Sequence, residues 1–135
     1  MLFRSTGLID PGVCLWGRRR CRYLRRDFER PVVPDDATLP DALLRRLQKV
    51  RRPKILVGGL SNRVEAFLDR DGVYCGAVST YTIVHQRDEP AELERLCRFL
   101  NSRAATERLI LEMGAHAMGG GRITLTKDFV RRLFS

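Results

Sequence analysis

The sequence predicts a single α+β domain, with a mostly antiparallel sheet and helices packed on one side. Three observations support this fold class: segments with helical spacing of leucines, short runs of β-forming residues between turn signals, and a length of 135 residues with 44% hydrophobic content. That length and composition suit one domain with a core of its own. We divide the chain into a basic, irregular or β N-terminal part (1–38) and an α+β body (39–135).

The N-terminal part lacks helical periodicity. Turn-forming residues at 10–12 and at Gly17 interrupt it, and short strands are predicted at 13–16 and within 21–28. Prolines and aspartates at 31–36 mark an exposed connection to the body.

The body begins with a predicted helix over residues 40–50. Leu39, Leu43, Leu47 and Val50 recur at spacings of three and four residues, and Pro53 ends the pattern. Two further helices are predicted at 90–100 and 102–113, and a short last helix at 127–133.

Strands are predicted between these helices. Residues 54–57 form a short apolar run before Gly58-Gly59, residues 64–68 alternate in polarity, and residues 73–84 are rich in β-forming side chains. Because a turn sequence separates the last two, we predict that they pair as a hairpin. A glycine-containing loop at 115–121 then leads to a short strand at 122–125.

Positive charge is concentrated at the N-terminal end. The net charge is +9, and residues 1–54 hold 14 basic and 6 acidic residues against 11 and 10 in the remainder. Arginines grouped around aromatic residues are typical of a protein that binds a polyanion. The same arginines could also form a solvent-exposed surface that binds no partner. The densest group comprises Arg18, Arg19, Arg20, Arg22, Arg25, Arg26 and Arg30.

The four cysteines form no CxxC pair, and neither histidine stands at metal-ligand spacing from them. We therefore expect reduced thiols and no metal site. No apolar run reaches the roughly 20 residues that span a bilayer, so we expect a soluble, cytoplasmic chain with no membrane partner.

No motif indicates catalysis by this chain alone. Gly58-Gly59 lacks the GxGxxG or Walker spacing of a nucleotide-binding turn. The serines, Cys75 and the two histidines show no spacing that supports a triad. Gly119-Gly120-Gly121 is either a phosphate-binding or an ordinary flexible loop, and the hydroxyls of Ser79 and Thr80 either contact DNA or face solvent from a sheet.

Several segments together resemble the specificity domain of type II adenine-specific DNA methyltransferases. The similarity covers nearly the whole chain and depends on the shared order of its motifs. These are Leu8-Ile9-Asp10-Pro11-Gly12 with Leu15-Trp16-Gly17, Arg52 to Val57, Arg63 to Asp69 with Gly76 to Tyr81, Leu100-Asn101-Ser102, and Gly119 to Ile123 with Lys127.

The resemblance implies a target recognition domain that binds double-stranded DNA and selects its sequence. A neighbouring catalytic domain or subunit would flip the adenine and transfer the methyl group from S-adenosylmethionine. This chain lacks the Asn/Asp-Pro-Pro-aromatic motif and the glycine-rich cofactor turn of that domain, and the lysine that the family carries near Ala77-Val78. We therefore expect no enzyme activity and no cofactor in this chain, which would be a fragment, a split subunit or the product of a decayed gene.

The DNA-binding residues follow from the charge and from the resemblance. The alternative is a basic interaction module whose partner is RNA or an acidic protein. We expect DNA contacts from Arg18, Arg19, Arg20, Arg22, Lys54, Asn62, Arg63, Ser79, Thr80, Arg122 and Lys127, beside the flexible loop Gly119, Gly120 and Gly121.

Overall fold

The computed structural model describes residues 2–4, 8–34, 38–76, 80–113, 123–124 and 126–132, and they form an α+β fold. The described helices are α1 (Asp41–Val50), α2 (Pro90–Leu100), α3 (Arg103–Met113) and α4 (Lys127–Arg132). The described strands are β1 (Leu2–Arg4), β2 (Ile9–Asp10), β3 (Val13–Cys14), β4 (Cys21–Tyr23), β5 (Arg26–Phe28), β6 (Lys54–Gly58), β7 (Leu60–Ser61), β8 (Ala66–Asp69), β9 (Tyr74–Gly76), β10 (Thr80–Val84) and β11 (Ile123–Thr124).

A three-stranded antiparallel sheet in the order β10-β6-β8 forms the centre of the molecule. The middle strand, β6, is buried along its whole length, as its run of apolar residues predicts. Val57 lies opposite Ala66 on one side and Tyr81 on the other.

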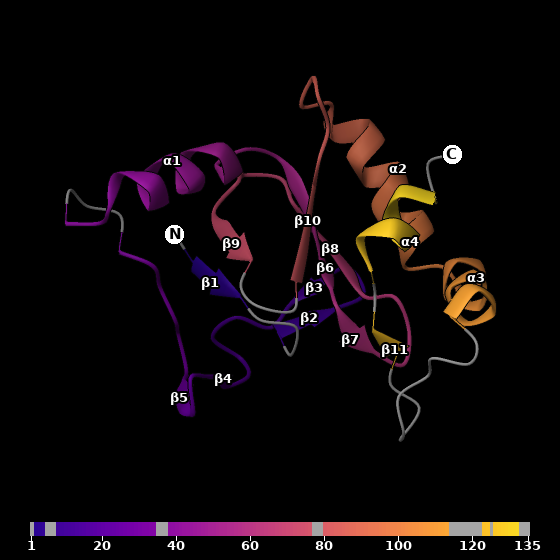
Figure 1. Cartoon of the computed structure of the whole chain (residues 1–135), viewed down its shortest axis with the longest axis horizontal. Helices are drawn as coiled ribbons and strands as arrows, with labels where there is room; N and C mark the ends of the chain where they lie inside the picture. The colour runs from indigo at the N-terminus through magenta and orange to yellow at the C-terminus, as the bar shows by residue number, and fades with distance from the viewer. Residues whose placement is uncertain are drawn as a thin grey trace.

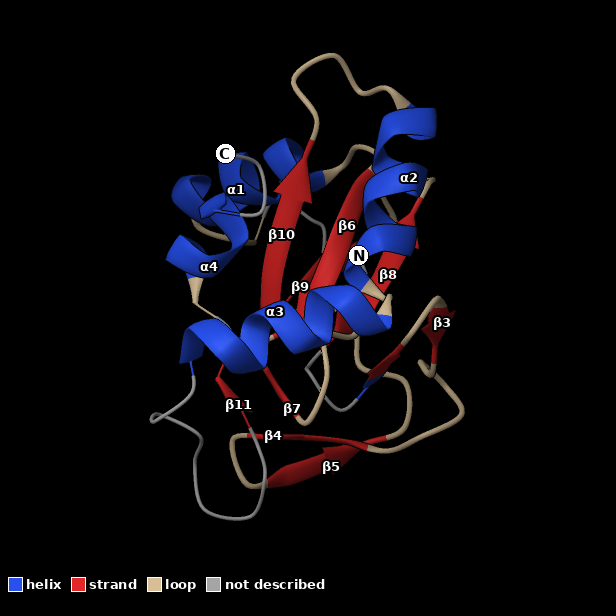
Figure 2. Ribbon diagram, turned by 90° about the vertical axis from the view of Figure 1, so that its right-hand side faces the viewer, coloured by secondary structure: helices blue, strands red, loops and turns tan. Residues whose placement is uncertain are grey.

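Helices α2, α3 and α4 gather on one side of this sheet (Figure 2), whereas α1 lies across the sheet from α2 (Figure 1). Helix α2 contacts β8 and β6, and α3 packs against α2. The predicted apolar stripe of α2 therefore faces the core, whereas in α1 Leu47 is buried and Leu43 is exposed. The core cluster consists of Ile55, Val57, Val64, Ala66, Leu93, Cys97, Leu100 and Leu109.

The predicted hairpin between residues 64–68 and 73–84 is wrong. Strand β8 pairs with β6, and β10 pairs with the opposite edge of β6. The predicted long strand is described as two strands, of which β9 pairs in parallel with β1. The most apolar strand takes the centre of the sheet, because there both of its faces and both of its edges are covered.

The edge of β8 away from β6 is closed by a side chain. The Asn101 amide donates to the carbonyl of Ala66 at 2.9 Å and accepts from the Ala66 N–H at 2.8 Å. It thus satisfies the two backbone groups that a further strand would bind at this position. Asn101 follows the last residue of α2, so this contact also holds that helix against the sheet.

Other short strand pairs join distant parts of the chain. Strand β11 pairs with β7, and β2 pairs with β3 in a small hairpin. The carbonyl of Ala66 also accepts a hydrogen bond from the N–H of Gly12, which ties the turn after β2 to β8. Within the described residues, none of the helices is long and apolar enough to cross a membrane.

Two glycines with the same backbone conformation offer a matched stability test. Gly72 (φ +67°) and Gly12 (φ +70°) both adopt the left-handed region, but a Cβ at Gly72 would lie 2.5 Å from the Arg52 nitrogen, whereas one at Gly12 meets nothing within 4 Å. We expect Gly12→Ala to lower the free energy of unfolding by about 1–2 kcal/mol, from backbone strain alone. Gly72→Ala should cost about 1–3 kcal/mol more, because the backbone beside it must move. Urea unfolding of both variants checks this, and equal losses would contradict it.

Candidate nucleic-acid interface

The segment from Trp16 to Pro31, which we call the arginine lobe, holds the densest charge of the chain. It contains seven arginines and two acidic residues, which leaves a net charge of +5. All seven arginines are exposed. In Figure 1 the lobe carries β4 and β5 away from the central sheet.

The lobe is attached at its base. Cys21, at the start of β4, is 1% exposed, and Pro31 is buried at the other end. The indole N–H of Trp16 donates to the carbonyl of Pro31 at 2.8 Å and so closes the segment into a loop. These contacts fix both ends of the lobe while its arginines remain in solvent.

Strands β4 and β5 form a hairpin with an unusual tip. Tyr23 pairs with Arg26, which leaves Leu24 and Arg25 as a two-residue loop. Both have positive φ, +49° and +63°, the pattern of a type I′ turn, in which Asn-Gly is the preferred sequence. Left-handed backbone costs a residue with a Cβ about 1–2 kcal/mol. The hairpin therefore keeps two unfavourable residues at its tip.

The arginines before β4 and after β5 line a concavity of about 470 Å³, which is formed by Gly17, Arg18, Arg19, Arg20, Glu29 and Arg30. Arg20 lies 3.6 Å from Glu29, and Arg19 lies 3.9 Å from Asp10. Ion pairs this long and this exposed contribute little to stability, so another anion can readily replace the carboxylate. Arg18 and Arg30 form no ion pair with an acidic side chain in the described part of the chain. The concavity can therefore accept a phosphate group between guanidinium donors.

Other predicted contact residues lie at the same end of the molecule. Strands β4, β5 and β7 lie toward the lower end in both views, whereas β10 begins near the middle of the molecule (Figures 1 and 2). Asn62 and Arg63 follow β7 and are exposed, and Arg63 pairs with Glu65 at 3.3 Å. Thr80 begins β10 and is half-buried. Strand β7 and the lobe therefore lie at the same end of the molecule.

The remaining predicted contacts are not part of this group. Lys127 is exposed at the first position of α4, whose Val130 packs against the core cluster. Outside the described residues lie Ser79, Arg122 and the loop Gly119, Gly120 and Gly121.

Lys54 is the one predicted DNA contact that the structure contradicts. Its side chain is fully buried, and its ammonium donates to the Oδ2 atom of Asp69, which lies opposite it in the β6–β8 register. The carboxylate also accepts from the backbone N–H groups of Val73 and Tyr74. Lys54 therefore neutralises a buried carboxylate and reaches no surface where DNA could bind.

Sequence reasoning did not select Arg25, Arg26 or Arg30 as contacts. The hairpin returns Arg30 to the side of Arg18, although 12 positions separate them in sequence. A two-residue loop between the matching segments 21–23 and 26–28 is the signal that predicts this return. Because this loop lacks the usual Asn-Gly or Asp-Gly sequence, the signal is weak.

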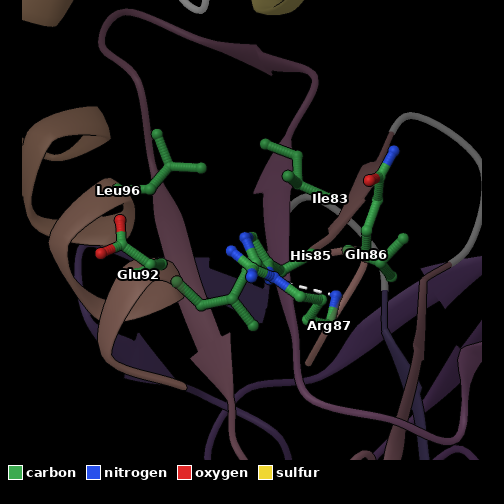
Figure 3. Close-up of a pocket in the computed structure, with 8 residues that line it drawn as sticks. Ile83, His85, Gln86, Arg87, Glu92 and Leu96 are labelled. Atoms are coloured by element: carbon green, nitrogen blue, oxygen red, sulfur yellow. Dashed lines mark hydrogen bonds between the residues drawn. The ribbon is translucent and has the colours of Figure 1, made fainter. Parts of the chain in front are cut away.

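A second concavity, of about 550 Å³, lies between the end of β10 and α2 (Figure 3). His85 and Arg87 line one side of it, and Glu92 and Leu96 line the α2 side. The His85 Nδ1 atom accepts from the N–H groups of Arg87 and Glu89, at 3.3 and 3.4 Å, so a neutral ring carries its proton on Nε2. No serine, threonine or cysteine is among its described lining residues.

Two of the thiols, Cys75 and Cys97, have raised pKa values. Burial raises the pKa of the Cys75 thiol, which outweighs the opposing effect of Arg46 and Lys54. Burial, aided by Glu94, raises the pKa of Cys97 to about 11. Both therefore remain protonated at neutral pH, and the thiolate is the reactive form. Within the described residues, no three His, Cys, Asp or Glu side chains are grouped to hold a metal ion.

Comparison with known proteins gives no assignment. No family model matches the sequence, and no curated protein matches it.

Proposed function

We propose that this chain is a DNA-binding module that recognises a short duplex sequence for an adenine-specific methyltransferase or restriction-modification enzyme. The observation that carries the proposal is the arginine lobe, which has seven exposed arginines, four of which line a concavity. Phosphate contacts by arginine supply most of the affinity in protein–DNA binding. The part of the proposal that concerns methyltransferases follows from the motif order described above.

The proposed division of labour leaves the chemistry to another polypeptide or domain. The lobe binds phosphates, while side chains after β7 and at the start of β10 approach the bases. A catalytic partner binds S-adenosylmethionine and the flipped adenine.

Selection from a randomised duplex DNA pool tests the proposal. The purified chain is incubated with the pool near physiological salt, and the retained DNA is sequenced. We expect enrichment of one short motif that contains adenine. Retention without enrichment would contradict sequence recognition and leave a general polyanion binder. No retention even at low salt, with binding of RNA or of an acidic protein instead, would contradict DNA binding itself.

A further inference from the structure

The tip of the β4–β5 hairpin has two features that the charge of the lobe does not explain. Leu24 is 78% exposed, and it occupies a left-handed conformation that disfavours leucine. Arginines 22, 25 and 26 surround it, all exposed, and none pairs with an acidic side chain that the structure describes. A solvated turn gains nothing from an exposed apolar residue in this conformation.

We propose that this hairpin enters the major groove of duplex DNA and places Leu24 against the 5-methyl group of a thymine. This inference rests on the proposed function and names how the same surface reads a base. The major groove, about 12 Å wide, admits a two-stranded β-ribbon, and the thymine methyl is its main apolar feature. Leu24 is the only apolar residue of the two-residue loop, so it leads the hairpin into the groove.

The surrounding charges suit this insertion. Arg22 lies on β4, Arg25 shares the tip with Leu24, and Arg26 begins β5, so guanidinium groups stand on both strands. The phosphates that border the groove lie on both sides of an inserted ribbon, where these side chains can bind them. Because Cys21 and Pro31 are buried at the base, the hairpin enters as a supported element.

The test compares a duplex with and without the thymine methyl. The probes are a 20-base-pair alternating A·T duplex and the same duplex with deoxyuridine in place of thymine, both at 50 mM salt. We expect the wild-type chain to bind the thymine duplex roughly fourfold more tightly, the effect of burying one methyl group. Leu24→Asn should bind both duplexes equally.

Asparagine is chosen because it tolerates left-handed backbone and is preferred in type I′ turns. The variant should therefore unfold at the same temperature as the wild type or higher, which separates loss of contact from loss of structure. Leu111→Asn is the matched control, because Leu111 is 83% exposed but lies on α3. This control should keep the wild-type ratio between the two duplexes.

The outcomes distinguish this inference from the proposed function. If the wild type binds both duplexes equally, or if Leu24→Asn keeps the wild-type ratio, the hairpin contact is wrong while DNA binding stands. Failure of the wild-type chain to bind the randomised pool and both of these duplexes would overturn both proposals.

Discussion

Replacing Lys54 with methionine should lower the free energy of unfolding by about 3 kcal/mol, the lower end of the range for breaking a buried ion pair. Methionine has a similar unbranched stem, so the loss comes from leaving the Asp69 carboxylate without its cation. The cost stays at the lower end because Val73 and Tyr74 continue to donate backbone hydrogen bonds to that carboxylate. Urea unfolding followed by the helical circular dichroism signal measures it.

A second substitution shows whether the uncompensated charge is the cause. Asn at position 69 is neutral and keeps one carbonyl oxygen for the backbone N–H groups, so the Lys54→Met/Asp69→Asn double variant should be more stable than Lys54→Met alone. Lys49→Met, on the exposed face of α1, is the control and should cost less than about 1 kcal/mol. A double variant that is less stable than Lys54→Met would show that the Asp69 carboxylate stabilises the fold through the N–H groups of Val73 and Tyr74 even without its cation, and that an uncompensated charge is not the cause of the loss.

The behaviour of Lys54 shows where sequence reasoning reaches its limit. A lysine at the start of an apolar strand is usually solvated, and nothing near it in the sequence names a partner. Asp69 can be identified as the partner only once the β6–β8 register is known, because that register places the two residues opposite each other. The turn sequence after β8 predicted a tight hairpin, but Asp69 instead binds the N–H groups of Val73 and Tyr74 and directs the chain toward β1.

Local sequence patterns predicted the structure more reliably than the pairing of distant segments. The leucine spacing predicted α1 and α2 to within one residue at each end. A helix that packs one face against the protein carries apolar residues at spacings of three and four, and this pattern can be recognised in the sequence. The arginine cluster likewise predicted an exposed basic surface. What could not be predicted is the shape of that surface, since the concavity depends on the β4–β5 hairpin and on the hydrogen bond between Trp16 and Pro31.

Removing three charges from the arginine lobe should have the largest effect on DNA binding. We expect the triple variant Arg18→Gln, Arg22→Gln, Arg30→Gln to reduce the slope of log affinity against log salt by about 2.7, at 0.9 for each lost phosphate contact. Near 0.1 M salt, affinity should fall on the order of 10²–10³-fold. These arginines form no ion pair with described acidic residues, and they represent the turn before β4, β4 itself and the segment after β5.

A second triple variant separates position from net charge. Arg95, Arg98 and Arg103 are also exposed, and each pairs with a glutamate three or four positions away on its own helix. Changing these three to glutamine also lowers the net charge from +9 to +6. We expect this variant to keep a salt slope within one of the wild-type value, because α2 and α3 lie away from the lobe (Figure 1).

The slopes are measured by titrating a fluorescent duplex at several salt concentrations. A phosphate contact contributes to the slope only if its cation displaces counterions at the DNA surface. The slope therefore measures direct contact, whereas affinity alone reflects total charge. Equal losses of slope in the two triple variants would mean that the chain binds DNA through its overall charge, in no single orientation. An unchanged slope in the lobe variant would exclude the lobe as the phosphate-binding surface, and DNA binding would then have to be assigned to another face of the molecule.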